Sequence, residues 1–216
     1  MCVVSYSSQM EVIVEAARAT VQLEKEVPLS IANALRRTLL LDLPAVAPSI
    51  FTIEKNSSPF PCETLAHRIG LCPVLANTKE TQRFSLSAVG PGHFYSDAVV
   101  KIDDENSNTN AQPNELLSPG IYLFSLSAKQ EVRLRGECRL GTGRKHARFQ
   151  TTCAVCLSTA PGGGSVLSFE SISSSAVEEA LRQSVCILRR RLREVVLGLE
   201  SLRRGCDAGN VAVAAC

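Results

Sequence analysis

Apolar residues recur along the chain in two periods, one typical of helices and one typical of strands. The clearest pattern stands near the end, where apolar residues return at alternating spacings of four and three, as in a helix packed along another helix. These positions are Leu181, Val185, Leu188, Leu192, Val195, Leu199 and Leu202. Ser175 and Glu178 have the spacing of a capping box, and Gly205 predicts the end of the helix near residue 204. A helix of that extent is about 45 Å long, so part of its apolar stripe is expected to meet a partner, although packing on the chain's own sheet fits the pattern equally well.

Shorter patterns alternate between strand and helix in the first third of the chain. Residues 12–23 are rich in β-branched side chains and predict a strand. Residues 31–39 follow helical spacing after Pro28 and Ser30, and the helix is expected to stop near Pro44. A second strand is predicted over 46–54 and a second helix over 62–69.

The middle of the chain has a different character. From residue 77 to 160, short alternating segments are separated by Gly, Pro, Asn and Ser, which predicts an all-β insertion. One of these strands is predicted to bury Val132, Leu134, Cys138 and Leu140 on one face. Residues 161–165, Pro-Gly-Gly-Gly-Ser, predict a flexible connection out of the insertion. The pattern as a whole indicates an α+β fold.

Composition excludes several classes of protein. The 216 residues are 45% hydrophobic and 20% charged, which is ordinary for a globular domain, and no apolar run approaches the roughly 20 residues that span a bilayer. The first fifteen residues lack the pattern of a secretory signal, so the protein is expected inside the cell, with its nine cysteines reduced. A net charge of +2 is too small to make the whole surface a nucleic-acid footprint.

Candidate chemistry is sparse. The chain has three histidines and no phosphate-binding loop, so neither a catalytic site nor a cofactor is predicted. Cys153 and Cys156 have a metal-like spacing, but the second pair that zinc needs is missing, and in a strand they point to opposite faces. We therefore expect one buried and one half-buried thiol and no metal. The basic stretch 144–149 is suited to phosphate or to an acidic protein.

Three segments resemble one known family. Residues 30–47 (SIANALRRTLLLDLPAVA), 62–74 (CETLAHRIGLCPV) and 141–155 (GTGRKHARFQTTCAV) stand in the order found in the alpha-like subunits of multisubunit DNA-dependent RNA polymerases. This family includes bacterial alpha, its archaeal counterpart and the third-largest subunit of eukaryotic polymerase II. The resemblance extends from about residue 12 to residue 204. The zinc loop of the polymerase II member is not matched, because residues 75–84 contain no cysteine.

The resemblance implies a non-catalytic assembly subunit for transcription. It implies a discontinuous dimerisation domain, residues 1–75 and 165–216, interrupted by a β-rich insert over 76–164. The partners would be a smaller alpha-like subunit, in a heterodimer, and the two largest polymerase subunits, with DNA met only through the complex and no membrane. The location would be the nucleus in a eukaryote, and otherwise the cytoplasm, a virion or a viral factory.

The same resemblance assigns roles to two sets of residues. The dimer seam would comprise Ile31, Leu35, Leu39, Leu181, Leu188, Leu192, Val195 and Leu199. Asn33, Arg36 and Arg37 would contact a large subunit from other faces of the first helix. Two alternatives stay open on the residues alone: a free-standing helical dimerisation adaptor with a β-rich binding domain, and a thiol-dependent enzyme that uses Cys153 or Cys156.

Overall fold

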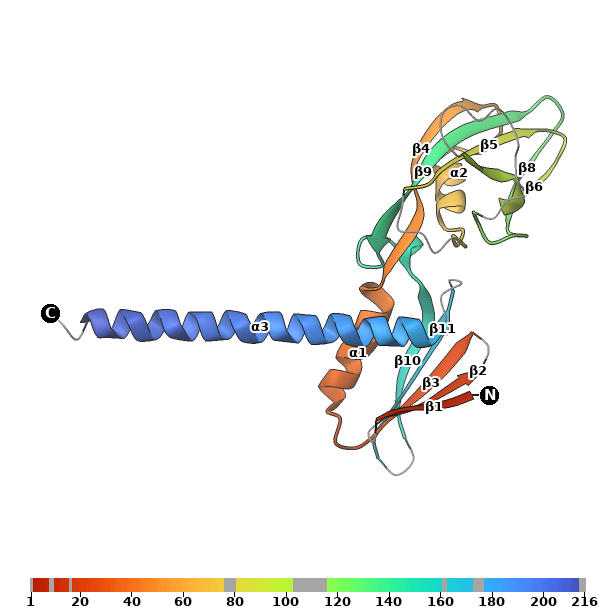
Figure 1. Ribbon diagram of the computed structural model, residues 1–216. Coiled ribbons are helices and arrows are strands. Elements are labelled where there is room, and N and C mark those ends of the chain that lie inside the picture. The colour runs from red at the N-terminus through yellow and green to blue at the C-terminus, as the bar shows by residue number, and fades with distance from the viewer. Residues whose placement is uncertain are drawn as a thin grey trace.

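The computed structural model describes residues 2–7, 10–15, 17–75, 81–102, 116–160, 163–172 and 177–213 of the chain. Its elements form two bodies, each with its own sheet and its own apolar core (Figure 1). Both sheets are antiparallel and both are covered by helices. The predicted α+β class is confirmed.

The first body is a five-stranded sheet with two helices packed on it. Its strand order is β1-β2-β3-β11-β10, and its core joins residues from both ends of the chain, including Val21, Leu35, Phe169 and Leu181. The elements are β1 (Cys2–Ser7), β2 (Met10–Glu15), β3 (Arg18–Leu23), α1 (Leu29–Leu41), β10 (Thr152–Thr159), β11 (Ser165–Ser171) and α3 (Val177–Val213).

In the described residues, the second body contains a sheet of order β4-β9-β5-β7, a two-stranded β6-β8 ribbon, one α-helix and two short 3-10 helices. Phe84, Phe124, Leu65 and Leu134 are among its fully buried side chains. The elements are β4 (Pro44–Asn56), α2 (Cys62–Gly70), β5 (Arg83–Val89), β6 (Gly92–Tyr95), η1 (Ser96–Ala98), β7 (Val99–Ile102), β8 (Tyr122–Leu126), β9 (Glu131–Thr142) and η2 (Ala147–Phe149). In β9, Leu140 is 56% exposed, so its predicted inward orientation is wrong.

The two bodies divide the chain differently from the expected 76–164 insert. β4 and α2 precede residue 76, yet β4 pairs with β9 and α2 contributes Leu65 and Ile69 to the second core. β10 precedes residue 165, yet it pairs with β11 in the first sheet. Periodicity identifies a strand but not its neighbour, and the neighbour decides which body the strand joins.

Two turns differ from the sequence prediction. Residues 12–23 are not one strand but the β2-β3 hairpin, whose connection has no Gly, Pro, Asn or Asp to signal it. Residues 161–165 are not a connection between bodies: Thr159 pairs with Ser165, so they join β10 to β11 within one sheet. Gly163 and Gly164 have φ values of +91° and +100°, a conformation that favours glycine at both positions.

Helix α3 is the most extended element. It runs for 37 residues, about 55 Å at 1.5 Å per residue, and projects away from both bodies toward the C-terminus (Figure 1). Gly205 does not end it, because one glycine in a helix costs only about 1 kcal/mol relative to alanine. Of the predicted capping box, Ser175 lies outside the described residues, and Glu178 stands in the first turn.

Candidate functional site

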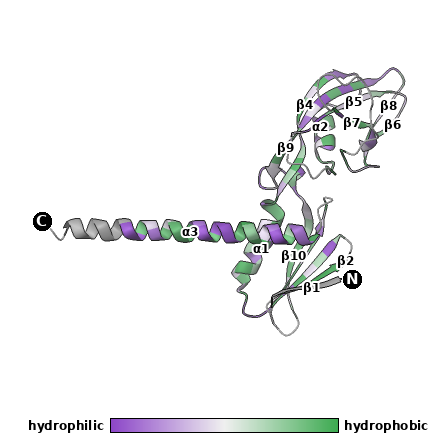
Figure 2. Ribbon diagram, viewed as in Figure 1, coloured by the Kyte–Doolittle hydropathy of each residue, from purple (hydrophilic) through white to green (hydrophobic). Residues whose placement is uncertain are grey.

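The apolar stripe of α3 divides into a buried part and an exposed part. Val177, Ala180 and Leu181 are buried in the first core, and Ile187 and Leu188 pack against its edge. Beyond Leu188 the same face of the helix has left the sheet. Figure 2 shows apolar and polar residues alternating along this projecting portion.

The exposed part of the stripe keeps the spacing of a helix-helix contact. At about 100° per residue, four later apolar side chains point within about 40° of the direction of Leu188 around the helix axis. They are Leu192, Val195, Leu199 and Leu202. Their exposed fractions are 47% for Leu192, 59% for Val195, 60% for Leu199 and 67% for Leu202. In the monomer, these four aligned side chains form an apolar surface that is exposed to water. Such a surface is typical of a protein-protein interface.

The predicted dimer seam is therefore only partly available to a partner. Leu35, Leu39 and Leu181 are 5%, 0% and 3% exposed and lie in this chain's own core, so their assignment to a partner contact is wrong. The reason is that α1 lies across the sheet and contacts the first turns of α3. Ile31, 38% exposed, stands at the rim, and Leu188 joins the buried part of the stripe to the exposed part.

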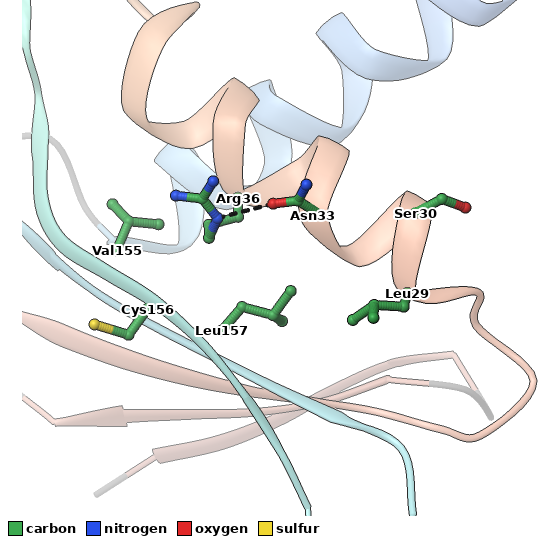
Figure 3. A pocket seen from close by; sticks show the side chains of 7 residues that line it. All are labelled: Leu29, Ser30, Asn33, Arg36, Val155, Cys156 and Leu157. Atoms are coloured by element: carbon green, nitrogen blue, oxygen red, sulfur yellow. Dashed lines mark hydrogen bonds between the residues drawn. The ribbon is translucent and has the colours of Figure 1, made fainter.

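The other predicted contact residues lie on the outer side of α1. Asn33 and Arg37 are exposed, and Arg36 is half-buried. Arg36 Nε donates a hydrogen bond to Asn33 Oδ1 at 3.0 Å, at a shallow groove between α1 and the edge strand β10 (Figure 3). Leu29, Ser30, Val155, Cys156 and Leu157 complete its lining.

Asp42, which the sequence did not single out, joins three segments at the end of α1. Its carboxylate, 3% exposed, accepts a hydrogen bond from Arg144 Nε at 3.0 Å and forms an ion pair with Arg191 of α3. Burial by itself would raise the pKa of Asp42, but the hydrogen bonds and charges of Arg191 and Arg144 hold it below its ordinary value of 3.8. Strand β4 of the second body starts at Pro44, two residues after Asp42. The carboxylate therefore fixes α3 next to the point where the chain enters the second body.

Asp42→Asn is expected to destabilise the protein by about 1.5–3 kcal/mol at pH 7, the range for hydrogen bonds to charged groups. Because the folded-state pKa is lowered, the carboxylate stabilises the fold above the unfolded-state pKa, and this contribution is lost as pH falls through the folded-state value. Urea unfolding of both proteins from pH 7 to pH 3 should show the difference shrinking below pH 3.8. A difference that is independent of pH would contradict this role.

The basic stretch 144–149 is mostly engaged within the chain. Arg144 pairs with Asp42, Arg148 donates to the carbonyl oxygen of Pro48 at 2.8 Å, and Phe149 is buried. Lys145 and His146 are exposed. The stretch ties the end of β9 to α1 and β4, and both of its arginines bind groups of this chain.

The six cysteines whose side chains the structure describes differ in exposure. Cys153 is half-buried and Cys156 exposed, so the expectation of a buried thiol there is wrong; β10 has a bulge at this point, with Ala154 at φ +50°. Burial raises the pKa of Cys72 to about 11 and that of Cys138 to about 12, which disfavours a nucleophilic thiolate.

Within the described residues, no three His, Cys, Asp or Glu side chains converge as metal ligands. In the same residues, no helix is long and apolar enough to span a bilayer.

Comparison with known proteins identifies RNA polymerase subunits among the relatives of this chain. No family model matches the chain. The chain is 28% identical over 180 residues to "DNA-directed RNA polymerase subunit Rpo3" of Methanocaldococcus jannaschii, an alignment covering 82% of this chain and 88% of that protein. It is 31% identical over 128 residues to Rpo3 of Natronomonas pharaonis, covering 57% of this chain and 49% of that one. It is 27% identical over 161 residues to "DNA-directed RNA polymerases II, IV and V subunit 3" of Arabidopsis thaliana, covering 61% and 50%. The chain thus spans about half the length of the last two relatives.

Proposed function

This chain is a relative of the alpha-like subunits of multisubunit DNA-dependent RNA polymerases, and from that premise we propose that it is a non-catalytic assembly subunit of such an enzyme. It pairs with a smaller alpha-like subunit, and the heterodimer forms the platform on which the two largest subunits assemble. Its place is the nucleus in a eukaryote and the cytoplasm in an archaeon.

The observation that carries the proposal is the exposed stripe of α3. Four apolar side chains in helical register, from Leu192 to Leu202, extend directly from a stripe that is already buried in the core. Full burial of a leucine or valine side chain contributes about 1.5–3 kcal/mol. A partner helix of similar length can cover this stripe without disturbing the fold, whereas the chain's own sheet ends before reaching it.

The partner contact is smaller than the full predicted seam. It comprises Ile31 at the rim, Leu188 where the stripe emerges, and Leu192, Val195 and Leu199 beyond. Leu35, Leu39 and Leu181 support it from inside by holding α1 and α3 together. A second copy of this chain could cover the same stripe, and this is the arrangement that a free-standing adaptor would adopt.

The test is to purify the tagged chain from its source cells and to measure the masses of the intact complexes by native mass spectrometry. A polymerase subunit should appear in one-to-one ratio with one smaller alpha-like chain and with two chains of the largest polymerase classes. A homodimer free of polymerase subunits would identify an adaptor instead and would overturn the proposal.

Contact with a large subunit is assigned to the outer side of α1. Arg37 is exposed and lies about 160° from Leu35 and Leu39, so Arg37→Ala should leave the heterodimer intact. If its guanidinium binds carboxylates or carbonyl oxygens of a large subunit, its loss should weaken recruitment by about 2–5 kcal/mol. The measurement is sequential reconstitution, first with the small partner and then with the second-largest subunit, followed by gel filtration.

Lys145→Ala is the matched control, because it removes an exposed positive charge from another part of the surface. Recruitment at the wild-type level by Arg37→Ala would show that this arginine is not part of the contact. Failure to form the heterodimer would show that the faces of α1 have been assigned wrongly.

A further inference from the structure

Helix α3 carries a second line of side chains on the face opposite its apolar stripe. At about 100° per residue, Arg190, Arg193, Leu197 and Arg204 lie within about 40° of the direction opposite Leu188. All four are exposed. We call these four residues the basic face.

Leu197 is an exposed apolar residue on this face that the dimer seam does not explain. Its side chain is 61% exposed, as much as Leu199, but it points about 180° away from the direction of Leu188. A helix with its side chains is about 10–12 Å across, so a partner helix on the stripe does not reach Leu197. Its neighbours three and four residues away are Arg193, Glu194, Glu200 and Ser201, so Leu197 is an apolar side chain set among charged and polar ones.

The part of α3 that carries the basic face is more positively charged than the chain as a whole. Residues 189–204 contain six arginines and two glutamates, a net charge of +4, against +2 for the whole protein. Arg191 forms an ion pair with Asp42, and Arg190 Nε lies 3.8 Å from Glu194 Oε1. Across the side chains that the structure describes, Arg193 and Arg204 have no carboxylate within ion-pair distance; Arg204 donates to the carbonyl oxygen of Glu200.

We infer that the basic face binds an acidic segment of another polypeptide, with Leu197 inserted into an apolar pocket between carboxylates held by the arginines. Arginine suits this role because its planar fork holds a carboxylate through two hydrogen bonds. The inference rests on the proposed function for its setting: with the stripe covered by the small subunit, the basic face is the side of α3 left for a further subunit.

An acidic protein fits this face better than nucleic acid does. A phosphate backbone attracts the arginines but offers no pocket for the central leucine, whereas a buried apolar side chain ringed by charged ones is the usual anatomy of a protein interface. The partner's contact surface should therefore combine Asp or Glu side chains with an apolar depression.

The first test reverses charge on the basic face of the full chain. Arg193→Glu combined with Arg204→Glu should leave the heterodimer intact and reduce incorporation of the reconstituted heterodimer into polymerase at least tenfold. Lys129→Glu combined with Lys145→Glu changes net charge equally at two exposed positions of the second body and should behave as wild type. Normal incorporation of the Arg193/Arg204 variant would overturn the inference.

The second test does not depend on the proposed function. Leu197 is replaced by the photo-cross-linker p-benzoylphenylalanine in the tagged chain, the cells are irradiated, and the cross-linked peptide is sequenced by mass spectrometry. A cross-link to a segment rich in Asp and Glu from a different polypeptide is the expected result, whether or not that polypeptide belongs to a polymerase. A cross-link to nucleic acid, to a second copy of this chain or to nothing would overturn the inference, while a chain that never enters a polymerase would refute only the proposed function.

Discussion

Leu192→Asp is expected to abolish pairing with the small alpha-like partner. Leu192 is the first side chain of the stripe wholly beyond the sheet, and 47% of it is exposed in the free chain. A partner helix on the stripe would bury the introduced carboxylate without a counter-charge, at a cost of about 3 kcal/mol or more, roughly two orders of magnitude in Kd. Co-expression followed by affinity pull-down and gel filtration measures the loss.

Leu197→Asp is the matched control for this experiment. It introduces the same charge in the same helix, but on the opposite face, so it should leave the heterodimer intact. Thermal unfolding of both variants alone should match wild type, because neither residue belongs to the first core. An unchanged yield of partner with Leu192→Asp would mean that the stripe is not the dimer contact.

Ending the chain at Glu194 is expected to produce a folded monomer that binds no small partner. The shortened chain keeps Val177, Ala180, Leu181 and Leu188 in or against the core and keeps Arg191 beside Asp42. It loses the exposed apolar side chains from Val195 to Leu202, the surface through which the full chain without its partner should self-associate. Light scattering and pull-down would measure both properties.

A chain ending at Arg190 provides the comparison for stability. It also removes Arg191, and with it one of the two arginines on the buried Asp42 carboxylate, so it should unfold at a lower denaturant concentration than the chain ending at Glu194. If the chain ending at Glu194 fails to fold, or still binds the partner fully, the exposed end of α3 has a different role from the one proposed.

The sequence predicted the elements whose patterns are local. The helices at 31–39 and 62–69 and the strand at 46–54 appear as α1, α2 and β4, because a stripe or an alternation of apolar residues is decided by the residues themselves. The heptad spacing after Leu181 likewise predicted the long helix α3. Its end was placed too early because a single glycine is a weak stop when the helix is otherwise favoured. The resemblance carried by residues 30–47, 62–74 and 141–155 pointed to the same polymerase relatives that comparison found.

Tertiary structure decided what these patterns contact. The spacing of Leu35, Leu39 and Leu181 is the same whether they face a partner or the chain's own sheet, and the fold places them in the core. Asp42 binds Arg144 and Arg191, which are 102 and 149 residues away in the sequence. No local sequence pattern carries information over such a separation. The stripe divides at Leu188 because the sheet ends there, and the exposure of the remaining side chains follows from the size of the sheet. Periodicity therefore determined which face of α3 is apolar, and the packing of the first body determined how much of that face is left for another chain.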